Sequence, residues 1–202
     1  MEVEDTFTQL PIQIDPQTKA ISTPSINSSE TATEIDHINA LNRAIVGLST
    51  PNSIPPPPVP VDPKRGAAIG KLRESGNAAL KKGQNAEAIR LYTYAIDASL
   101  SRPGWEPAGL IREEASALYS NRAQAHMGMQ AWPEGSIDAE CSLELKGMGN
   151  VKGWWRKGRC LMEMGRPEEA RDYVQQGLEF DPNERDLLGL LGDIEKAIQK
   201  RV

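Results

Sequence analysis

The sequence of 202 residues lacks the features that mark several common classes of protein. Its two cysteines, Cys141 and Cys160, have no metal-binding spacing and no histidine nearby, so we expect both to be small apolar packing residues. No apolar run approaches the roughly 20 residues that a membrane span needs, and the first residues are acidic where a signal peptide would be basic. The net charge of -5 argues against nucleic acid as a partner. These absences predict a protein of the reducing cytosol that binds no metal and no cofactor.

Motifs of catalysis are also missing from the sequence. His37 and His126 each stand without a serine or cysteine at a workable spacing, and no glycine-rich phosphate loop is present. The four tryptophans fall in helical or loop segments without the basic interleaving that stacks nucleic-acid bases. We therefore predict that the protein is not an enzyme and has no catalytic residues.

Residues 1–65 differ in composition from the rest of the chain. They hold ten of the fifteen prolines and carry eight acidic against four basic residues. The alternation over residues 7–14 favours a short strand, residues 22–33 resemble a loop, and residues 51–60 form a polyproline spacer. Between them an amphipathic helix is expected, because apolar residues recur at spacings of three and four: Ile35, Ile38, Leu41, Ile45 and Leu48.

This N-terminal extension has two interpretations. One is a flexible tail without a fixed structure. The other is a segment that buries its apolar stripe on a partner protein or on the rest of the chain, which the regularity of the stripe favours. One helix and one short strand are too little to make a domain by themselves.

From residue 66 onward the sequence predicts an all-α domain of repeated helix pairs. Three repeats are expected at about 69–102, 116–150 and 151–184, with small residues at Gly76, Ala123 and Gly158 where paired helices approach closely. Pro133 and Pro167 each begin a second helix, where a proline loses no helical hydrogen bond. About 13 extra residues stand between Leu100 and Glu114, and we expect the turn-rich residues 101–109 to form a loop.

The last helix, at about 184–201, is predicted to cap the stack. It has one apolar face that would cover the open surface of the third repeat. The residues expected on that face are Leu187, Leu188, Leu191, Ile194 and Ile198.

Five polar residues on the first helices of the repeats are predicted to line one groove: Arg73, Asn77, Asn121, Lys152 and Arg156. Lys152 and Arg156 are four residues apart, as are Arg73 and Asn77, so each pair shares one helical face. All five side chains donate hydrogen bonds, and we expect no acidic residue among them. Such a groove suits a carboxylate, although each residue alone could equally belong to a solvated face.

These residues resemble the carboxylate-clamp family of tetratricopeptide repeat (TPR) proteins. Arg-Glu-Ser-Gly-Asn at 73–77, Ser-Asn-Arg at 120–122 and Lys-Gly-Trp-Trp-Arg-Lys at 152–157 resemble its three clamp elements, with Arg73 where lysine is commoner. The resemblance implies that the groove binds the Glu-Glu-Val-Asp C-terminus of cytosolic heat-shock chaperones. It also implies a small apolar pocket, which Leu80, Gln124 and Met127 would line.

A longer part of the chain is similar to the small peripheral TPR subunit of the fungal Sec translocation complex. The likeness runs through the N-terminal helix, the polyproline spacer and residues 62–77. It implies a peripheral protein on the cytosolic face of the endoplasmic reticulum, without a membrane span. The stripe of the extension would bind a membrane-anchored Sec subunit, and the TPR domain would receive chaperones.

The sequence thus predicts a TPR adaptor that docks chaperone tails at a translocation site. One alternative is a soluble co-chaperone adaptor with no membrane complex, and another is a scaffold whose groove binds an internal peptide. A TPR module attached to an enzyme is a further class, but the chain has neither room nor motif for a second, catalytic domain.

Overall fold

The computed structural model describes residues 10–24, 28–47, 61, 63–104 and 106–200. The chain divides into two compact units, with residues 1–61 and 103–105 in one and residues 62–102 and 106–202 in the other. We call the first the extension and the second the repeat unit. The all-α prediction is confirmed, with one two-stranded hairpin in the extension as the exception among the described residues. No described helix is both long enough and apolar enough to cross a membrane.

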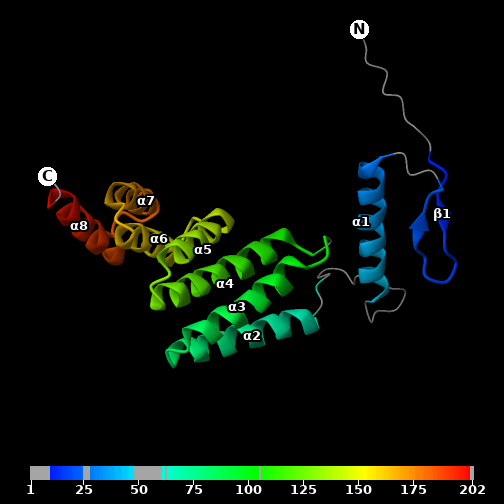
Figure 1. Ribbon diagram of the computed structural model, residues 1–202, viewed down its shortest axis with the longest axis horizontal. Helices are drawn as coiled ribbons and strands as arrows, with labels where there is room; N and C mark the ends of the chain where they lie inside the picture. Colours follow the sequence, from blue (N-terminus) through cyan, green and yellow to red (C-terminus); the bar gives the residue numbers. More distant parts are fainter. Residues whose placement is uncertain (1–9, 25–27, 48–60, 62, 105, 201–202) are drawn as a thin grey trace, which may run out of the picture. The chain divides into compact units, whose positions relative to one another are not determined.

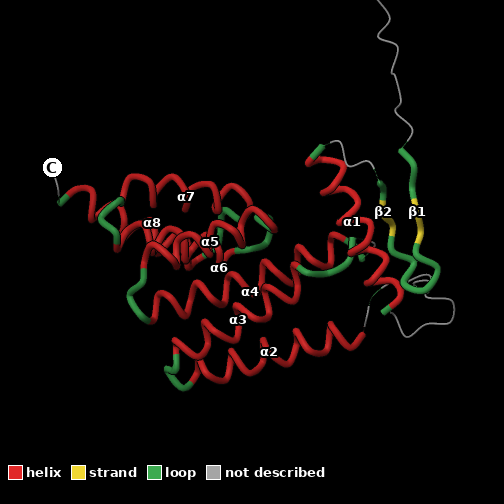
Figure 2. Tube along the Cα trace, turned by 45° about the vertical axis from the view of Figure 1, so that its right-hand side comes forward, coloured by secondary structure: helices red, strands yellow, loops and turns green. Residues whose placement is uncertain are grey.

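The repeat unit is a row of antiparallel helices that follow one another in sequence order (Figure 1). The first helices of the three pairs are α2 (Pro63–Lys81), α4 (Ala108–Gly128) and α6 (Val151–Glu163). The second helices are α3 (Asn85–Leu100), α5 (Trp132–Leu145) and α7 (Pro167–Phe180), and α8 (Arg185–Gln199) ends the row. First helices also contact one another, α2 with α4 and α4 with α6, and the tube view shows the pairs side by side (Figure 2). This contact brings residues from all three pairs onto one surface.

Two glycines, which carry no side chain, let the helix pairs approach closely. A Cβ atom at Gly76 of α2 would lie 2.6 Å from the ring of Tyr92 on α3. At Gly158 of α6 it would lie 2.5 Å from the side chain of Val174 on α7. Tyr92 and Val174 are fully buried, so neither can move aside without opening the core. The small residues that the sequence suggested for packing therefore have this role at both ends of the stack.

The extra residues before the second repeat differ from the expected loop. Helix α4 begins at Ala108, eight residues before the predicted start, so only residues 101–107 connect it to α3. A buried ion pair stabilises this corner: Arg102 donates to Glu106 at 2.5 Å and to Glu114 at 3.0 Å. Glu114 also accepts a hydrogen bond from Ser99 of α3 at 2.7 Å. Repeat spacing could not reveal this, because it counts residues that lie outside the common motif and says nothing of their conformation.

Helix α8 caps the stack, but its buried face differs in part from the predicted one. Leu187, Leu190 and Ile194 are buried against α6 and α7, while Leu191 and Ile198 are partly buried. Leu188 is 46% exposed, so its predicted place in the cover is wrong. Positions 187, 190 and 194 follow the spacing of three and four that one helical face requires, and position 188 is turned about 100° away.

The extension contains the hairpin and helix α1 (Ser29–Val46), which lie together in Figure 1. Strand β1 (Gln13–Ile14) pairs antiparallel with β2 (Ile21–Ser22), at the edge of an expected loop. Of the strand expected over residues 7–14, the structure describes residues 10–14, and within these only residues 13–14 are strand. The Asn39 side chain joins α1 to the hairpin, since it accepts from the Ile21 amide at 2.7 Å and donates to the Ile21 carbonyl at 2.8 Å.

No residue of α1 is buried in the described structure. Of the predicted partner-binding stripe, Ile38 and Leu41 are each 43% exposed, and Ile35 and Ile45 are half-buried. Leu48, the fifth predicted member, lies outside the described residues. The stripe therefore has apolar surface that the described residues of the extension leave uncovered.

Candidate functional site

Arg156 of α6 is a buried cation without an anionic partner among the described residues. Its side chain reaches α4, where Nε donates to the Gln124 side-chain oxygen at 3.1 Å and Nη1 donates to the Ser120 hydroxyl. The residue is only 8% exposed, and burial lowers the pKa of its guanidinium. An arginine stays protonated even so, which leaves a desolvated positive charge held by two neutral oxygens. Such a charge favours the approach of an anion.

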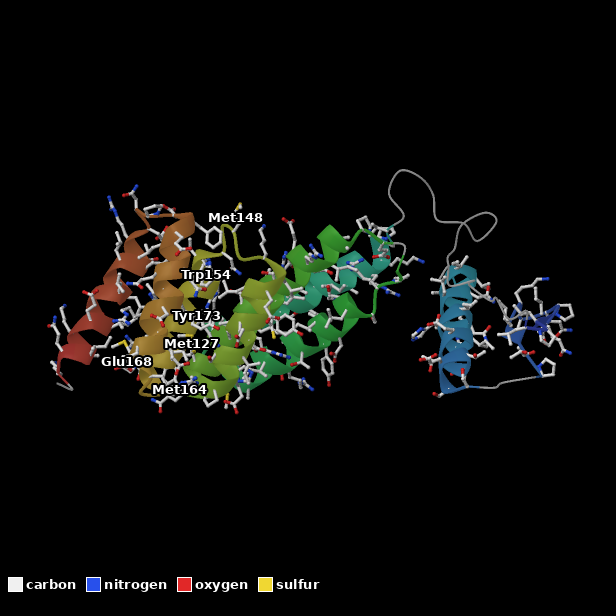
Figure 3. The ribbon with its side chains drawn as sticks, turned by 90° about the horizontal axis from the view of Figure 1, so that it is seen from above. Met127, Met148, Trp154, Met164, Glu168 and Tyr173 are labelled. Atoms are coloured by element: carbon white, nitrogen blue, oxygen red, sulfur yellow. The ribbon has the colours of Figure 1, made fainter. Side chains whose placement is uncertain are left out.

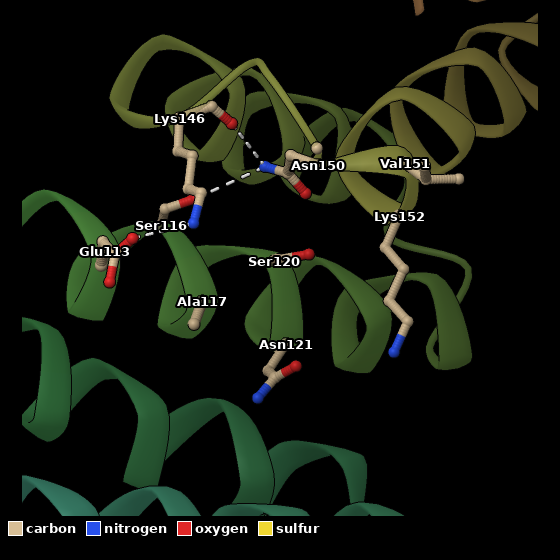
Figure 4. A pocket seen from close by; sticks show the side chains of 10 residues that line it. Glu113, Ser116, Ala117, Ser120, Asn121, Lys146, Asn150, Val151 and Lys152 are labelled. Atoms are coloured by element: carbon tan, nitrogen blue, oxygen red, sulfur yellow. Dashed lines mark hydrogen bonds and ion pairs between the residues drawn. The ribbon is translucent and has the colours of Figure 1, made fainter. Parts of the chain in front are cut away.

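Lys152 lies one turn before Arg156 on the same face of α6 and is exposed. It lines two adjoining pockets, of about 390 Å³ and about 300 Å³, that share Val151 and Lys152. The larger pocket includes Asn121 and Ser120 of α4, and the smaller one includes Gln124, Trp155 and Arg156. In Figure 4 the Lys152 and Asn121 side chains extend into the same space. We call the two pockets together, with the adjacent Asn77 side chain, the groove.

Asn77 and Asn121 meet between α2 and α4. The Asn121 side-chain nitrogen donates to Asn77 Oδ1 at 3.3 Å, and the Tyr92 hydroxyl donates to the same oxygen at 2.7 Å. The Asn77 amide nitrogen therefore keeps both of its hydrogens for another acceptor, since the described residues offer it none. Both asparagines contribute donors at the same place.

Arg73 is the predicted clamp residue that the structure does not join to the other four. It lies on α2 one turn before Asn77 and is exposed. No described hydrogen bond or ion pair connects it with Asn77, Asn121, Lys152 or Arg156. Of the five predicted clamp residues, the groove therefore contains the two cations of α6 and the two asparagines, and Arg73 lies one helical turn before Asn77.

The three residues predicted to line an apolar pocket have different surroundings. Gln124 lines the smaller pocket through its contact with Arg156. Met127, labelled in Figure 3, is 8% exposed and packs where a Cβ atom at Gly135 of α5 would lie 3.4 Å away. Leu80 packs beside the core between α2 and α3. Met127 and Leu80 pack at helix interfaces, and the shared pocket stays a prediction.

The expectation that no acidic residue lines the groove is wrong. Asp186, in the first turn of α8, lines the smaller pocket with Lys152 and Arg156. Glu113 lines the larger one, where it pairs with Lys146 at 2.9 Å. The first helices alone could not predict Asp186, since the capping helix brings it to the groove.

The sequence analysis did not predict that Ser120 and Gln124 accept hydrogen bonds from the guanidinium of Arg156. They are four apart on α4, and Ser120 precedes Asn121 directly. A search for polar pairs with helical spacing beside each clamp residue could have found them.

Other chemistry finds little support in the described part of the chain. No group of three or more His, Cys, Asp or Glu side chains there could hold a metal ion. Burial raises the pKa of the Cys160 thiol to about 12, so this thiol stays protonated and unreactive. The structure thus treats Cys160 as a packing residue, in agreement with the sequence interpretation.

Comparisons with known proteins point to the same repeat and to two groups of relatives. The family model described as a tetratricopeptide repeat matches residues 151–184, which span α6 and α7. The Hsp70-Hsp90 organizing protein 2 of Arabidopsis thaliana is 36% identical over 116 residues, which are 57% of this chain and 18% of that protein. The second TPR domain of the human RPAP3 protein, solved with the HSP70 peptide SGPTIEEVD, aligns with a TM-score of 0.55 and 24% identity over 65% of this chain and 98% of that one.

Two matches cover most of the chain. In the Sec complex from S. cerevisiae, one chain aligns with a TM-score of 0.69 and 24% identity, covering 95% of this chain and 99% of that one, which establishes a shared fold. The ER protein translocation subcomplex subunit sec67 of Schizosaccharomyces pombe is 34% identical over 143 residues, which are 70% of this chain and 74% of that protein. From the repeat architecture and this identity over most of both chains, we conclude that the protein belongs to the family of the ER translocation subunit sec67.

Proposed function

We propose that this protein is a non-catalytic TPR adaptor whose groove binds the C-terminal Glu-Glu-Val-Asp tail of cytosolic heat-shock chaperones. By this binding it docks the chaperones at the translocation complex of the endoplasmic reticulum, on the cytosolic face, for post-translational import. The extension is its attachment to a membrane-anchored Sec subunit.

The observation that carries the tail-binding proposal is the buried guanidinium of Arg156. This cation is largely desolvated, and its acceptors are two neutral oxygens. An incoming carboxylate would therefore give it a strong, favourable electrostatic interaction. Lys152 and the amides of Asn77 and Asn121 lie at the same groove, so more than one carboxylate oxygen can be held. A C-terminal aspartate supplies an α-carboxylate and a side-chain carboxylate close together, which this set of donors suits.

The relatives support the kind of partner that we propose. One relative is an Hsp70-Hsp90 organizing protein, and one structural neighbour was solved with an HSP70 peptide that ends in Glu-Glu-Val-Asp. The sec67 relative is a subunit of an ER translocation subcomplex, which supports the site of docking. The exposed Ile38 and Leu41 support attachment through the extension over a freely diffusing co-chaperone adaptor, for which an uncovered apolar stripe would have no use.

Calorimetric titration of a Glu-Glu-Val-Asp peptide tests the groove. We expect micromolar affinity for the wild type, about -8 kcal/mol. Lys152→Ala should weaken binding by roughly 1.5–3 kcal/mol because a charge-assisted bond is lost, and this exposed residue can be changed without disturbing the fold. Arg156→Ala should cost a similar amount or more.

Two controls isolate the proposed chemistry. Arg171→Ala removes a cation from α7, away from the residues that line the groove, and should leave the affinity unchanged. Amidation of the peptide removes its terminal carboxylate and should weaken binding to the wild type. Equal affinities for the free and the amidated peptide would refute a carboxylate site.

A further inference from the structure

Tyr92 lies beneath the groove without lining either of its two pockets. Its side chain belongs to α3 and is fully buried, and its ring occupies the space that Gly76 leaves open in α2. From there the hydroxyl reaches the side chain of the next residue, Asn77, with a distance of 2.7 Å between the two oxygens. Tyr92 therefore joins a core position to a residue of the proposed site.

The direction of this hydrogen bond decides what Asn77 presents to a ligand. A carboxamide offers an oxygen that accepts on one side and a nitrogen that donates on the other. Because Tyr92 and Asn121 both donate to Asn77 Oδ1, the oxygen is occupied and the amide nitrogen is left for the groove. In the reverse orientation the Asn77 nitrogen would face the donating amide of Asn121. The Asn77 oxygen would then face the incoming carboxylate, and the two groups would repel each other.

Burial raises the pKa of the Tyr92 hydroxyl, so the group keeps its proton and can donate over the physiological range. The positive charge of Arg156 acts on the pKa of the same hydroxyl in the opposite sense and is the smaller of the two causes.

We propose that Tyr92 is a positioning residue for the carboxylate site: its hydroxyl fixes the amide of Asn77 with the N–H donors toward the ligand. This inference rests on the proposed function of the groove, and it assigns a ligand-binding role to a residue that touches no ligand. It also gives Gly76 a purpose beyond packing, because the ring reaches Asn77 through the space at that glycine.

A double-mutant cycle with the Glu-Glu-Val-Asp peptide tests the positioning role. Tyr92→Phe keeps the ring and removes the hydroxyl, and we expect binding about three- to tenfold weaker, the effect of one hydrogen bond. In a protein that already carries Asn77→Ala, the same change should have no effect, because the amide that Tyr92 orients is gone. An equal loss in both backgrounds, or no loss in either, would overturn the inference.

Tyr173→Phe is the matched control. Tyr173 lies on α7, and its hydroxyl donates to Glu140 at 2.9 Å, a bond that does not involve a groove residue. The variant also loses one tyrosine hydrogen bond, so it reports on stability without the effect on Asn77. Its affinity for the peptide should equal that of the wild type.

A measurement without ligand separates this inference from the proposed function. In the free protein, nitrogen relaxation measured by NMR should show that the side-chain amide of Asn77 is rigid. In Tyr92→Phe the same measurement should show that this amide has become mobile, while the backbone signals keep their positions. An unchanged Asn77 side chain would refute the positioning role even if the wild type binds the peptide. A mobilised Asn77 in a protein that binds no peptide would refute the proposed ligand and retain the positioning role.

Discussion

Helices α1 and α8 both carry an apolar stripe, but among the described residues the two stripes have different surroundings. In α8, Leu187 and Ile194 are fully buried and Leu190 is 4% exposed. In α1 no residue is buried, and Ile38 and Leu41 remain 43% exposed. The described neighbour of α1 is a hairpin that it contacts through the polar side chains of Asn39 and Asn42. The spacing of apolar residues predicts a helix and a face, while the rest of the chain decides whether that face is covered.

The connection between elements explains the difference. Helix α8 follows α7 after the four residues 181–184, which leaves it beside the open surface of the last repeat. The described elements that precede α1 in the extension are strands of two residues each, too short to cover a stripe. A stripe of this kind gains free energy only when another surface covers it.

The largest effect is expected at the buried face of α8. Leu187→Ala should lower the free energy of unfolding by about 2–5 kcal/mol, because a fully buried side chain leaves a cavity. For a chain of this size the melting temperature should fall by roughly 4–20 °C. Leu188→Ala, the neighbouring change on an exposed side chain, should stay within about 0.5 kcal/mol. Thermal unfolding of both variants decides, and equal losses would mean that α8 does not cap the stack through this face.

A smaller effect is expected in α1, and on association instead of folding. Ile38→Asp combined with Leu41→Asp should weaken attachment to microsomes by at least about 2 kcal/mol, since the exposed part of both side chains would lose its cover. The melting curve of the repeat unit and its peptide affinity should not change. Co-sedimentation with microsomes measures the attachment.

The control for this pair places the same charges elsewhere on α1. Thr33→Asp combined with Ala40→Asp changes two exposed residues that lie about 110° and about 130° around the helix from the midpoint of Ile38 and Leu41, at about 100° per residue. This variant should sediment like the wild type. If the stripe variant also sediments like the wild type, the extension attaches by other residues.

Much of the architecture could be predicted from the sequence because it depends on local patterns. The helix pairs follow from periodicity, and the close approach at Gly76 and Gly158 follows from residue size. The helical start of the second repeat could not be predicted, because it depends on the buried pairing of Arg102 with Glu106 and Glu114. Contacts between distant residues leave no periodic signal.

The groove shows the same division. Four of the five predicted clamp residues meet there, since each lies on the inner face of a first helix. No hydrogen bond or ion pair of the described residues joins Arg73 to the others. Asp186 comes from the capping helix, which the repeat pattern places outside the groove. Met127 was expected at the ligand and is buried, because the spacing alone could not distinguish the groove side of α4 from its contact with α5.

The smallest effect is expected where α8 reaches the groove. Asp186 repels a carboxylate that approaches Lys152 and Arg156, so Asp186→Asn should tighten peptide binding by about 0.5–1 kcal/mol, and added salt should reduce the gain. Asp193→Asn makes the same change on α8 at a residue that does not line the groove, and should have no effect. Calorimetry at two salt concentrations measures both variants. Unchanged affinity for Asp186→Asn would mean that this acid does not influence the ligand.

The helices of the repeat unit contact mainly their neighbours in sequence, while the groove takes residues from α2, α4 and α6. A stack of this kind can open from one end while the rest stays helical. Loss of the last pair would remove Lys152 and Arg156 and leave most helical content in place, so binding would fail before a spectroscopic signal of unfolding appeared. Conversely, a ligand at about 100 times its Kd would raise the free energy of unfolding of the three-pair stack by about 2.7 kcal/mol. A bound tail would therefore act as a clasp between the two ends of the stack.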